Sequence, residues 1–304
     1  MKIRTLISSA AISLILLAGC NIPGVLPDQV AGLPGVLPSN LRSEHVEMAA
    51  RSVRAVSVAS RPISDSEEYY VGRAVAARIL QQYPLFKDSR LTQYVNLVGR
   101  TVALNSEKPN TYGGYHFALL NSPEINAFAC PGGAVFITLG MLRTVHSEDE
   151  LAAVLAHEVA HVNFRHGIDS ISKSRWTDAL AIIGTEAAKT YGSADVARLA
   201  GIFEASIDDI FKALVVNGYS RGQEEESDRA SLVYLARAGY NPKAMADFLD
   251  RLKQSGRGSS GGLLDTHPAA SDRLGEVRGS MPDRTVNPLL EQARTKRFSA
   301  TVLF

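Results

Sequence analysis

The chain has 304 residues, of which 45% are hydrophobic, so it can bury a sizeable core in one large domain or two modest ones. Its 32 basic and 31 acidic residues nearly balance, and it has no basic, aromatic-rich patch of the kind that binds nucleic acid. We therefore expect no nucleic-acid partner.

Residues 1–19 have the pattern of a secretion signal. Two basic residues precede an apolar run, Leu6–Leu17, that is too short for a comfortable membrane span. The run ends in Leu-Ala-Gly before Cys20, and this ending resembles the lipobox at which bacterial signal peptidase cleaves a lipoprotein. Cys20 is the expected lipidation site and first mature residue. An ordinary signal peptide with an incidental cysteine is the alternative.

Residues 20–65 are expected to be a tether. The unit Pro-Gly-Val-Leu-Pro occurs twice, at Pro23–Pro27 and Pro34–Pro38, and proline removes backbone donors and favours extended chain. Asn21 stands where an aspartate favours inner-membrane retention in some bacteria. We therefore expect a protein held by acyl chains, palmitate among them, at the periplasmic face of the outer membrane.

Beyond the tether, apolar spacing predicts an α+β fold that is mainly helical. Residues 66–80 and 91–104 have helical periodicity, and two short β-rich segments, His116–Leu120 and Ala134–Thr138, predict strands that flank a loop. The rest is expected to be mostly helical, with a mobile Gly/Ser-rich loop at 255–262.

Cys130 is the other cysteine of the chain, so no internal disulfide can form once Cys20 is acylated. A free thiol suggests a nucleophile, but Cys130 precedes Pro-Gly-Gly without a cysteine-protease signature. A buried apolar position is therefore the favoured interpretation.

The central motif of the chain is a helical His-Glu-x-x-His. Ser147 followed by Glu150 predicts a capping box that starts the helix. Residues four apart share a helix face, so His157 and His161 present two imidazoles to one ion while Glu158 stands over the position of a water. Histidines satisfied within a core are the alternative, although the surrounding helix is apolar and unpaired polar groups there are costly.

A catalytic zinc needs a third protein ligand. The metzincin pattern would require Gly at 164 and His at 167, where the chain has Phe164 and Gly167, so that class is excluded. His166 lies five residues after His161, and it is interpreted as a residue that supports a ligand or as a surface group.

A better source of the third ligand is an acidic segment downstream. Glu224 and Asp228 are four apart and Arg221 is three before Glu224, so the three are expected to share a helix face. A solvated helix surface is the ordinary alternative. The three consecutive glutamates also leave Glu225 open as the ligand.

Four motifs in order make the chain resemble a known family. They are Asn126-Ala127-Phe128-Ala129 with Pro131-Gly132-Gly133, His157 to His161, Ser220-Arg221 with Glu224 to Asp228, and Thr266-His267-Pro268 with Arg273. They are similar to those of the gluzincin zinc metallopeptidases that include the CAAX prenyl protease and HtpX, within them the periplasmic lipoprotein branch of BepA and LoiP. The resemblance implies a zincin-like fold over 66–280, with a small edge-strand sheet beside the active-site helix, and a tail at 281–304.

The resemblance also implies one zinc per chain. Glu224 would be the third ligand, because it stands four before Asp228, and Asp228 would orient a zinc-bound histidine. Glu158 would accept a proton from the attacking water and pass it to the leaving amine. Two positions depart from the family pattern, Cys130 for an aliphatic residue and Ser227 for an alanine.

Further site residues follow from the same resemblance. His267 would either stabilise the oxyanion or cap the zinc and restrain activity, and a turn residue is its plain alternative. The stretch 126–138 resembles an edge strand that pairs with extended substrate, with Asn126, Gly132 and Gly133 as substrate-binding residues. Glycines that merely form a turn are the alternative.

Together these features predict a metalloendopeptidase that cleaves unfolded or misassembled envelope proteins. The expected partners are protein or peptide substrates, the membrane through the lipid anchor, and envelope assembly machinery. An assembly factor or chaperone with a latent zinc site is the main alternative, although a structural site has no use for Glu158. A lipid-anchored binding protein would leave the order of the motifs unexplained.

Overall fold

The computed structural model describes residues 62–171, 204–255, 266–267, 270–283 and 286–302. The expected signal, the lipidation site at Cys20, most of the tether and the Gly/Ser-rich loop lie outside these residues.

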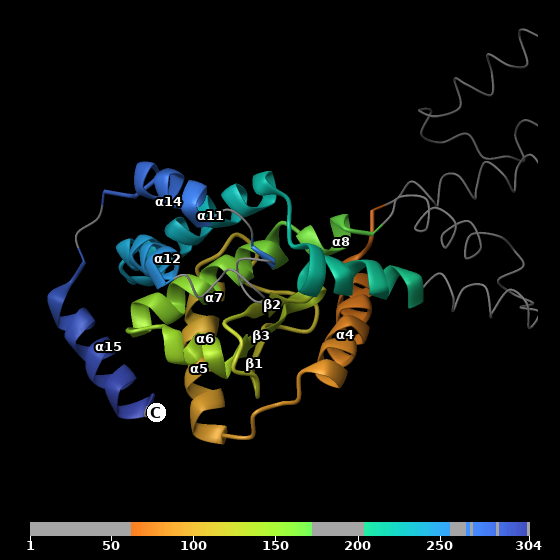
Figure 1. The fold of residues 1–304 in the computed structure, drawn as a ribbon, viewed down its shortest axis with the longest axis horizontal. Helices are drawn as coiled ribbons and strands as arrows, with labels where there is room; N and C mark the ends of the chain where they lie inside the picture. Colours follow the sequence, from red (N-terminus) through yellow and green to blue (C-terminus); the bar gives the residue numbers. More distant parts are fainter. Residues whose placement is uncertain (1–61, 172–203, 256–265, 268–269, 284–285, 303–304) are drawn as a thin grey trace, which may run out of the picture.

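The predicted helices and strands are present, together with elements that the sequence analysis did not separate (Figure 1). Before the catalytic motif come α4 (Asp65–Gln82), α5 (Ser89–Ala103), β1 (His116–Leu120), β2 (Ala127–Ala129), a 3-10 turn η2 (Pro131–Gly133), β3 (Ala134–Thr138) and α6 (Leu139–Thr144). Then come α7 (Glu148–Asn163), α8 (His166–Asp169), the π-helical turn η4 (Ala213–Asn217), α11 (Arg221–Ala238), α12 (Lys243–Ser255), α14 (Ala270–Gly279) and α15 (Pro288–Thr301). The α+β prediction is confirmed.

The described part of the chain holds a three-stranded sheet in the order β1-β3-β2. β1 runs parallel to β3, with His116 opposite Ala134, and β2 runs antiparallel to it, with Phe128 opposite Phe136. The expectation that all of 126–138 forms an edge strand is therefore wrong. The chain reverses through η2, so that β2 lies at the edge while β3 returns as the central strand.

Helix α7 lies at the centre of the domain, packed against α5, α11 and α12 (Figure 1). Every residue from Glu148 to Val162 is buried, and a helix that is apolar on all sides is stable only inside a core. This placement explains why two histidines in α7 can hold fixed positions.

The first turn of α7 is held by more than the predicted capping box. Ser147 accepts a hydrogen bond from the Glu150 backbone as expected. The Glu150 carboxylate, however, accepts from the backbone of His146 and pairs with Arg251 of α12. The reciprocal half of the box is thus replaced by a tertiary ion pair.

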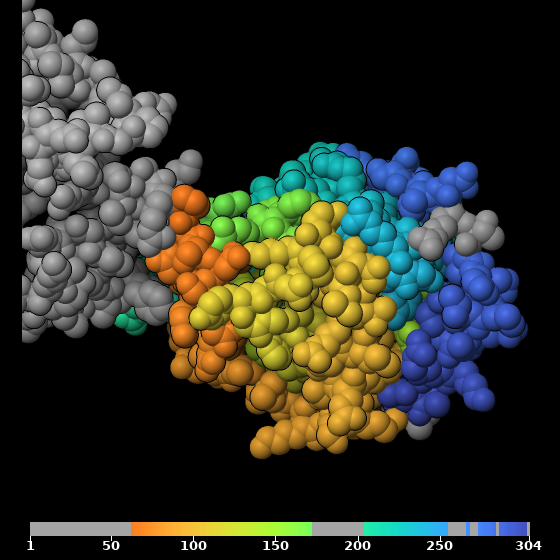
Figure 2. All heavy atoms as spheres, turned by 180° about the vertical axis from the view of Figure 1, so that it is seen from behind, coloured from red at the N-terminus to blue at the C-terminus, as the bar shows by residue number. Residues whose placement is uncertain are grey.

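Helix α15 also holds the first turn of α7 in place. Glu148 and Asp149, both buried, pair with Arg297 and Arg294 of α15. The expected tail at 281–304 therefore includes a helix packed on the domain. Seen from behind, the blue α15 forms the edge opposite the orange α4, and the orange-to-yellow segments up to the sheet cover most of the face between them (Figure 2).

Helix α4 packs closely on the turn η2. A side chain at Gly72 would meet the carbonyl oxygen of Pro131 at 1.7 Å, so only glycine permits this approach. Glu68, also on α4, accepts a hydrogen bond from the Gly132 backbone at 3.2 Å and pairs with Arg165 just beyond α7. These contacts fix the turn against the rest of the fold. Within the described ranges, no helix is both long and apolar enough to cross a membrane.

Candidate metal centre

Four buried side chains converge beside α7. His157 and His161 come from α7, Glu224 from α11 and His267 from the short segment at 266–267. One ligand-type atom from each lies within 4.8 Å of all the others. The sequence-predicted ligands are therefore brought together, and His267 joins them as a fourth member.

The cluster has the dimensions of a tetrahedral metal site. Zinc bonds of about 2.0–2.1 Å place tetrahedral ligand atoms about 3.3 Å apart. The Nε2 atoms of His157 and His161 are 3.0 Å apart, and each lies 3.4 Å from a carboxylate oxygen of Glu224. The Nδ1 atom of His267 is 3.2 Å from His157 Nε2 and 2.9 Å from Glu224 Oε1. Three imidazoles and one carboxylate are donors that suit zinc, so the residues fit this metal.

Glu158 stands next to the cluster with a buried carboxylate that accepts no hydrogen bond from the described residues. It is 1% exposed, and neither carboxylate oxygen has a hydrogen-bond partner among the described residues. The Nε2 atom of His267 lies 3.6 Å from Glu158 Oε1. Burial raises the pKa of Glu158, and a higher pKa makes a carboxylate a better proton acceptor.

The two helix histidines differ in protonation. Burial lowers the pKa of His161 well below its usual range, which keeps its ring neutral as a metal ligand requires. Burial and the charge of Arg273 lower the pKa of His157, but hydrogen bonds to Asp228 and Glu224 outweigh them and raise it to about 9. A metal ion at this site would therefore compete with a proton on His157.

Asp228 and Arg273 support the cluster from α11 and α14. Asp228 Oδ1 is 2.9 Å from the Nδ1 atom of His157. Arg273 donates to both oxygens of Asp228 at 2.7 and 2.6 Å and pairs with Glu224 Oε2 at 2.7 Å. Burial would raise the pKa of Asp228, but the Arg273 guanidinium outweighs it and lowers that pKa. Asp228 thus stays ionised beside His157.

The structure does not bring Arg221 to this face, which corrects the sequence expectation. Arg221 is the first residue of α11, and its exposed guanidinium pairs with Glu225 at 2.8 Å, one turn further along. Glu225 therefore lies outside the cluster, and Glu224 is the glutamate that faces the histidines. Arg273, and not Arg221, is the basic residue that pairs with Glu224 and Asp228.

Arg273 and His166 complete the surroundings of the cluster. Arg273 belongs to the fourth motif but had no role there. Of the two interpretations of His166, the structure supports the residue that supports a ligand, because its Nδ1 lies 2.8 Å from His161 Nδ1. The crowding of histidines in this segment was the signal for His166, and the left-handed turn that brings it back was not recognised.

The proposed substrate-binding residues are engaged inside the fold. The Asn126 side chain accepts from Thr266 Oγ1 at 3.1 Å and from the Ala127 backbone, so it ties the His267 segment to β2. Gly132 and Gly133 are buried with positive φ values of 77° and 107°, a conformation that favours glycine. This geometry supports the turn-forming alternative for both glycines.

Cys130 has the buried apolar position expected for it. It is free and fully buried, and burial raises the pKa of its thiol. A thiol kept protonated is a poor nucleophile.

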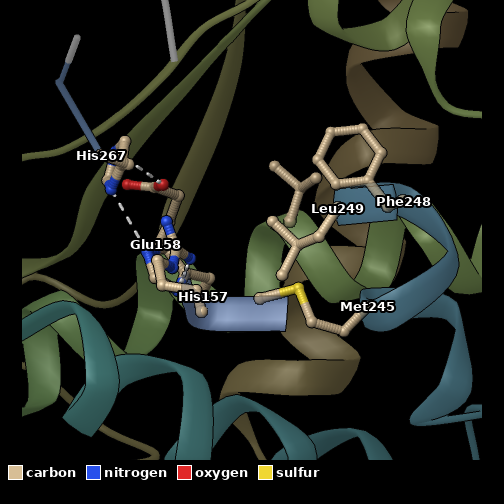
Figure 3. A pocket seen from close by; sticks show the side chains of 8 residues that line it. His157, Glu158, Met245, Phe248, Leu249 and His267 are labelled. Atoms are coloured by element: carbon tan, nitrogen blue, oxygen red, sulfur yellow. Dashed lines mark hydrogen bonds and ion pairs between the residues drawn. The ribbon is translucent and has the colours of Figure 1, made fainter. Parts of the chain in front are cut away.

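A pocket opens beside Glu158 and His267. The site residues lie on one side of it, and Met245, Phe248 and Leu249 of α12 point into it from the other (Figure 3). Val154 of α7 adds to this apolar wall. The small space next to the candidate reaction centre therefore has an apolar wall.

A buried cluster on a His-Glu-x-x-His helix, completed by a glutamate from a later helix, defines a zincin-like metallopeptidase fold. The family model described as "Peptidase family M48" matches residues 89–281. The chain belongs to this family.

Curated relatives agree with this assignment. A "Beta-barrel assembly-enhancing protease" of Yersinia pestis is 31% identical over 286 residues, which cover 91% of this chain and 52% of the relative. Its namesake in Escherichia coli K12 is 31% identical, covering 72% of this chain and 45% of the relative. "Metalloprotease LoiP" of Escherichia coli K12 is 26% identical, covering 63% of this chain and 69% of the relative. The chain thus spans about half the length of the first two.

Proposed function

We propose that the protein is a zinc-dependent endopeptidase that cleaves unfolded or misassembled proteins of the cell envelope. The observation that carries this proposal is the buried carboxylate of Glu158, which has no hydrogen-bond partner among the described residues and lies beside a buried cluster with the dimensions of a metal site. A purely structural metal site has no use for such a base. Membership of the M48 family and relatives named as proteases support the activity.

Each residue of the centre has a part in the proposed mechanism. His157, His161 and Glu224 would hold the zinc, which supplies a Lewis acid and lowers the pKa of water to about 7 when bound. Glu158 accepts the proton of the attacking water and returns it to the leaving amine. Asp228, held by Arg273, keeps a proton on His157 Nδ1 so that Nε2 faces the metal.

His267 is proposed to restrain this reaction. Its Nδ1 atom stands at the fourth corner of the cluster, at ligand-like distances from His157 and Glu224. A catalytic zinc needs that position for water or substrate. A centre closed in this way also matches the alternative of an assembly factor with a latent site, and relatives named assembly-enhancing proteases join both activities in one name. Envelope assembly machinery is therefore a proposed partner.

The apolar pocket predicts which bonds are cut. Unfolded proteins expose apolar side chains, and one of these would pack against the wall formed by Met245, Phe248 and Leu249. Mass spectrometry of the products from a mixture of unfolded proteins is expected to find an apolar residue at one fixed position relative to the cleaved bond. Leu249→Phe, which narrows the pocket, should shift that residue toward smaller side chains.

The matched control is Leu252→Phe, because Leu252 is buried on the same helix and is not among the residues that line the pocket. It should leave the preference as in the wild type. Cleavage sites without any fixed apolar position would refute the pocket assignment.

The ligand assignment predicts about one zinc per chain. His157→Ala, His161→Ala and Glu224→Ala should each bind zinc more weakly and lose much of it on purification, because each removes one of the three proposed ligands. Elemental analysis of the purified variants measures this. Glu225→Ala is the matched control and should retain the metal, since Glu225 pairs with Arg221 on the surface. An empty Glu225→Ala beside a full Glu224→Ala would show that the wrong glutamate was chosen.

The membrane anchor is proposed from the sequence around Cys20. Cys20→Ala should leave the precursor unlipidated and absent from membranes, because Cys20 is the thiol of the lipobox. Growth with a labelled fatty acid followed by cell fractionation tests this, with Cys130→Ala as the control that keeps the label. Label that persists in Cys20→Ala would rule out the anchor, and separation of the two membranes would test the proposed periplasmic face of the outer membrane.

A further inference from the structure

Beyond the metal cluster, a chain of polar contacts runs from His161 to the surface of α11. His166 Nδ1 lies 2.8 Å from His161 Nδ1, and His166 Nε2 lies 3.1 Å from Glu226 Oε2. His166 is 2% exposed, whereas the Glu226 side chain is 48% exposed. The buried imidazole therefore spans the distance between a candidate metal ligand and a carboxylate at the surface.

A break after α7 creates this arrangement. α7 ends at Asn163, and Arg165 adopts a left-handed conformation with φ of 59° before α8 begins at His166. Such a conformation is uncommon for a residue with a side chain. Arg165 is held there by Glu68 at 2.8 Å and by the carbonyl of Ile63 at 2.7 Å. The turn carries His166 back toward His161 and not onward around a continuous helix.

Metal binding by His161 fixes the donor and the acceptor in each hydrogen bond of this series. The Nε2 atom of His161 faces the cluster, so a metal bound there leaves the ring proton on Nδ1. His161 Nδ1 then donates to His166 Nδ1, which must be the unprotonated nitrogen of a neutral ring. The proton of His166 therefore sits on Nε2 and is donated to the Glu226 carboxylate.

We propose that His166 and Glu226 are positioning residues that orient His161 and fix its tautomer for metal binding. This inference rests on the proposed zinc function. His157 receives the same support directly from Asp228, whereas His161 has a histidine inserted before its carboxylate. Outer partners of this kind typically contribute about 10–100-fold in metal affinity.

The three consecutive glutamates of α11 have three different partners. Glu224 faces the metal cluster, Glu225 pairs with Arg221 at the surface, and Glu226 accepts from His166. Successive residues of a helix point about 100° apart, so each carboxylate meets a different partner. Glu225 is therefore a matched control for Glu226.

The test measures the zinc dissociation constant of the full chain by competition with a chromophoric chelator. His166→Leu and Glu226→Leu should bind zinc about 10–100-fold more weakly than the wild type. His166→Asn should largely restore binding, because its amide oxygen can accept from His161 Nδ1 near the place of the lost nitrogen. Glu225→Leu should bind as the wild type does.

Two outcomes separate this proposal from the zinc function. A wild type that binds no zinc would contradict the proposed function itself. A wild type that binds zinc, with His166→Leu and Glu226→Leu equally tight, would overturn the positioning role alone.

A measurement without substitutions guards against variants that fail to fold. Nitrogen-15 NMR of the zinc-loaded wild type should show His161 protonated on Nδ1 and His166 protonated on Nε2. A proton on Nδ1 of His166 would overturn the proposal.

Discussion

Glu158→Gln is expected to abolish proteolysis while the protein keeps its fold and its zinc. The amide preserves the size and shape of the side chain, but it cannot accept the proton of the attacking water. Because both oxygens of Glu158 lack hydrogen-bond partners in the described residues, the substitution breaks no hydrogen bond of the cluster. General-base catalysis typically contributes about 10²–10⁴-fold, so the rate should fall by at least about a hundredfold.

The measurement compares casein cleavage at equal zinc content, as determined by elemental analysis. Glu225→Gln is the matched control, since it makes the same chemical change on a carboxylate that pairs with Arg221. It should cleave at the wild-type rate. If Glu158→Gln kept near-normal activity, Glu158 would not be the base. The inactive variant would also retain its substrates, so proteomics of the trapped envelope proteins would identify them.

The sequence predicted those elements whose signal is local. The periodicity of α4 and α5 and the β-rich segments at β1 and β3 are visible within one short window each. β2 was not separated from β3, because three residues are too few for a pattern. The packing of α15 also escaped prediction, since Arg294 and Arg297 meet acids of α7 about 145 residues away in the chain.

At the candidate site, too, local patterns were predicted and contacts between distant segments were not. Spacing of four on a helix correctly placed His157 beside His161, and the resemblance correctly placed Glu224 with them. The prediction that Arg221 lies at the site was wrong, because helix spacing gives the face from which a side chain leaves the helix and not the partner that it contacts. Arg273 and His166 depend on tertiary contacts, the first across α11 and α14 and the second through the turn at 165.

A substitution of His267 is also expected to change the rate of proteolysis strongly. Its Nδ1 atom lies 2.9 Å from Glu224 Oε1, so it occupies the corner that a catalytic water would need. The segment is tied down by Thr266, whose hydroxyl donates to Asn126 and whose carbonyl accepts from the Tyr219 backbone. These two hydrogen bonds hold the backbone that carries His267 beside the cluster.

His267→Ala should consequently raise the rate of proteolysis, because it vacates the fourth position without removing a proposed zinc ligand. If His267 instead stabilised the oxyanion, the same substitution would lower the rate by about a hundredfold. The two roles predict opposite signs, so a comparison of wild type and variant on an unfolded substrate at equal zinc content decides between them. Asn126→Ala, which removes the acceptor of the Thr266 hydroxyl, should loosen the segment and raise the rate in the same direction. Equal rates in wild type and His267→Ala would return His267 to a simple turn residue before Pro268.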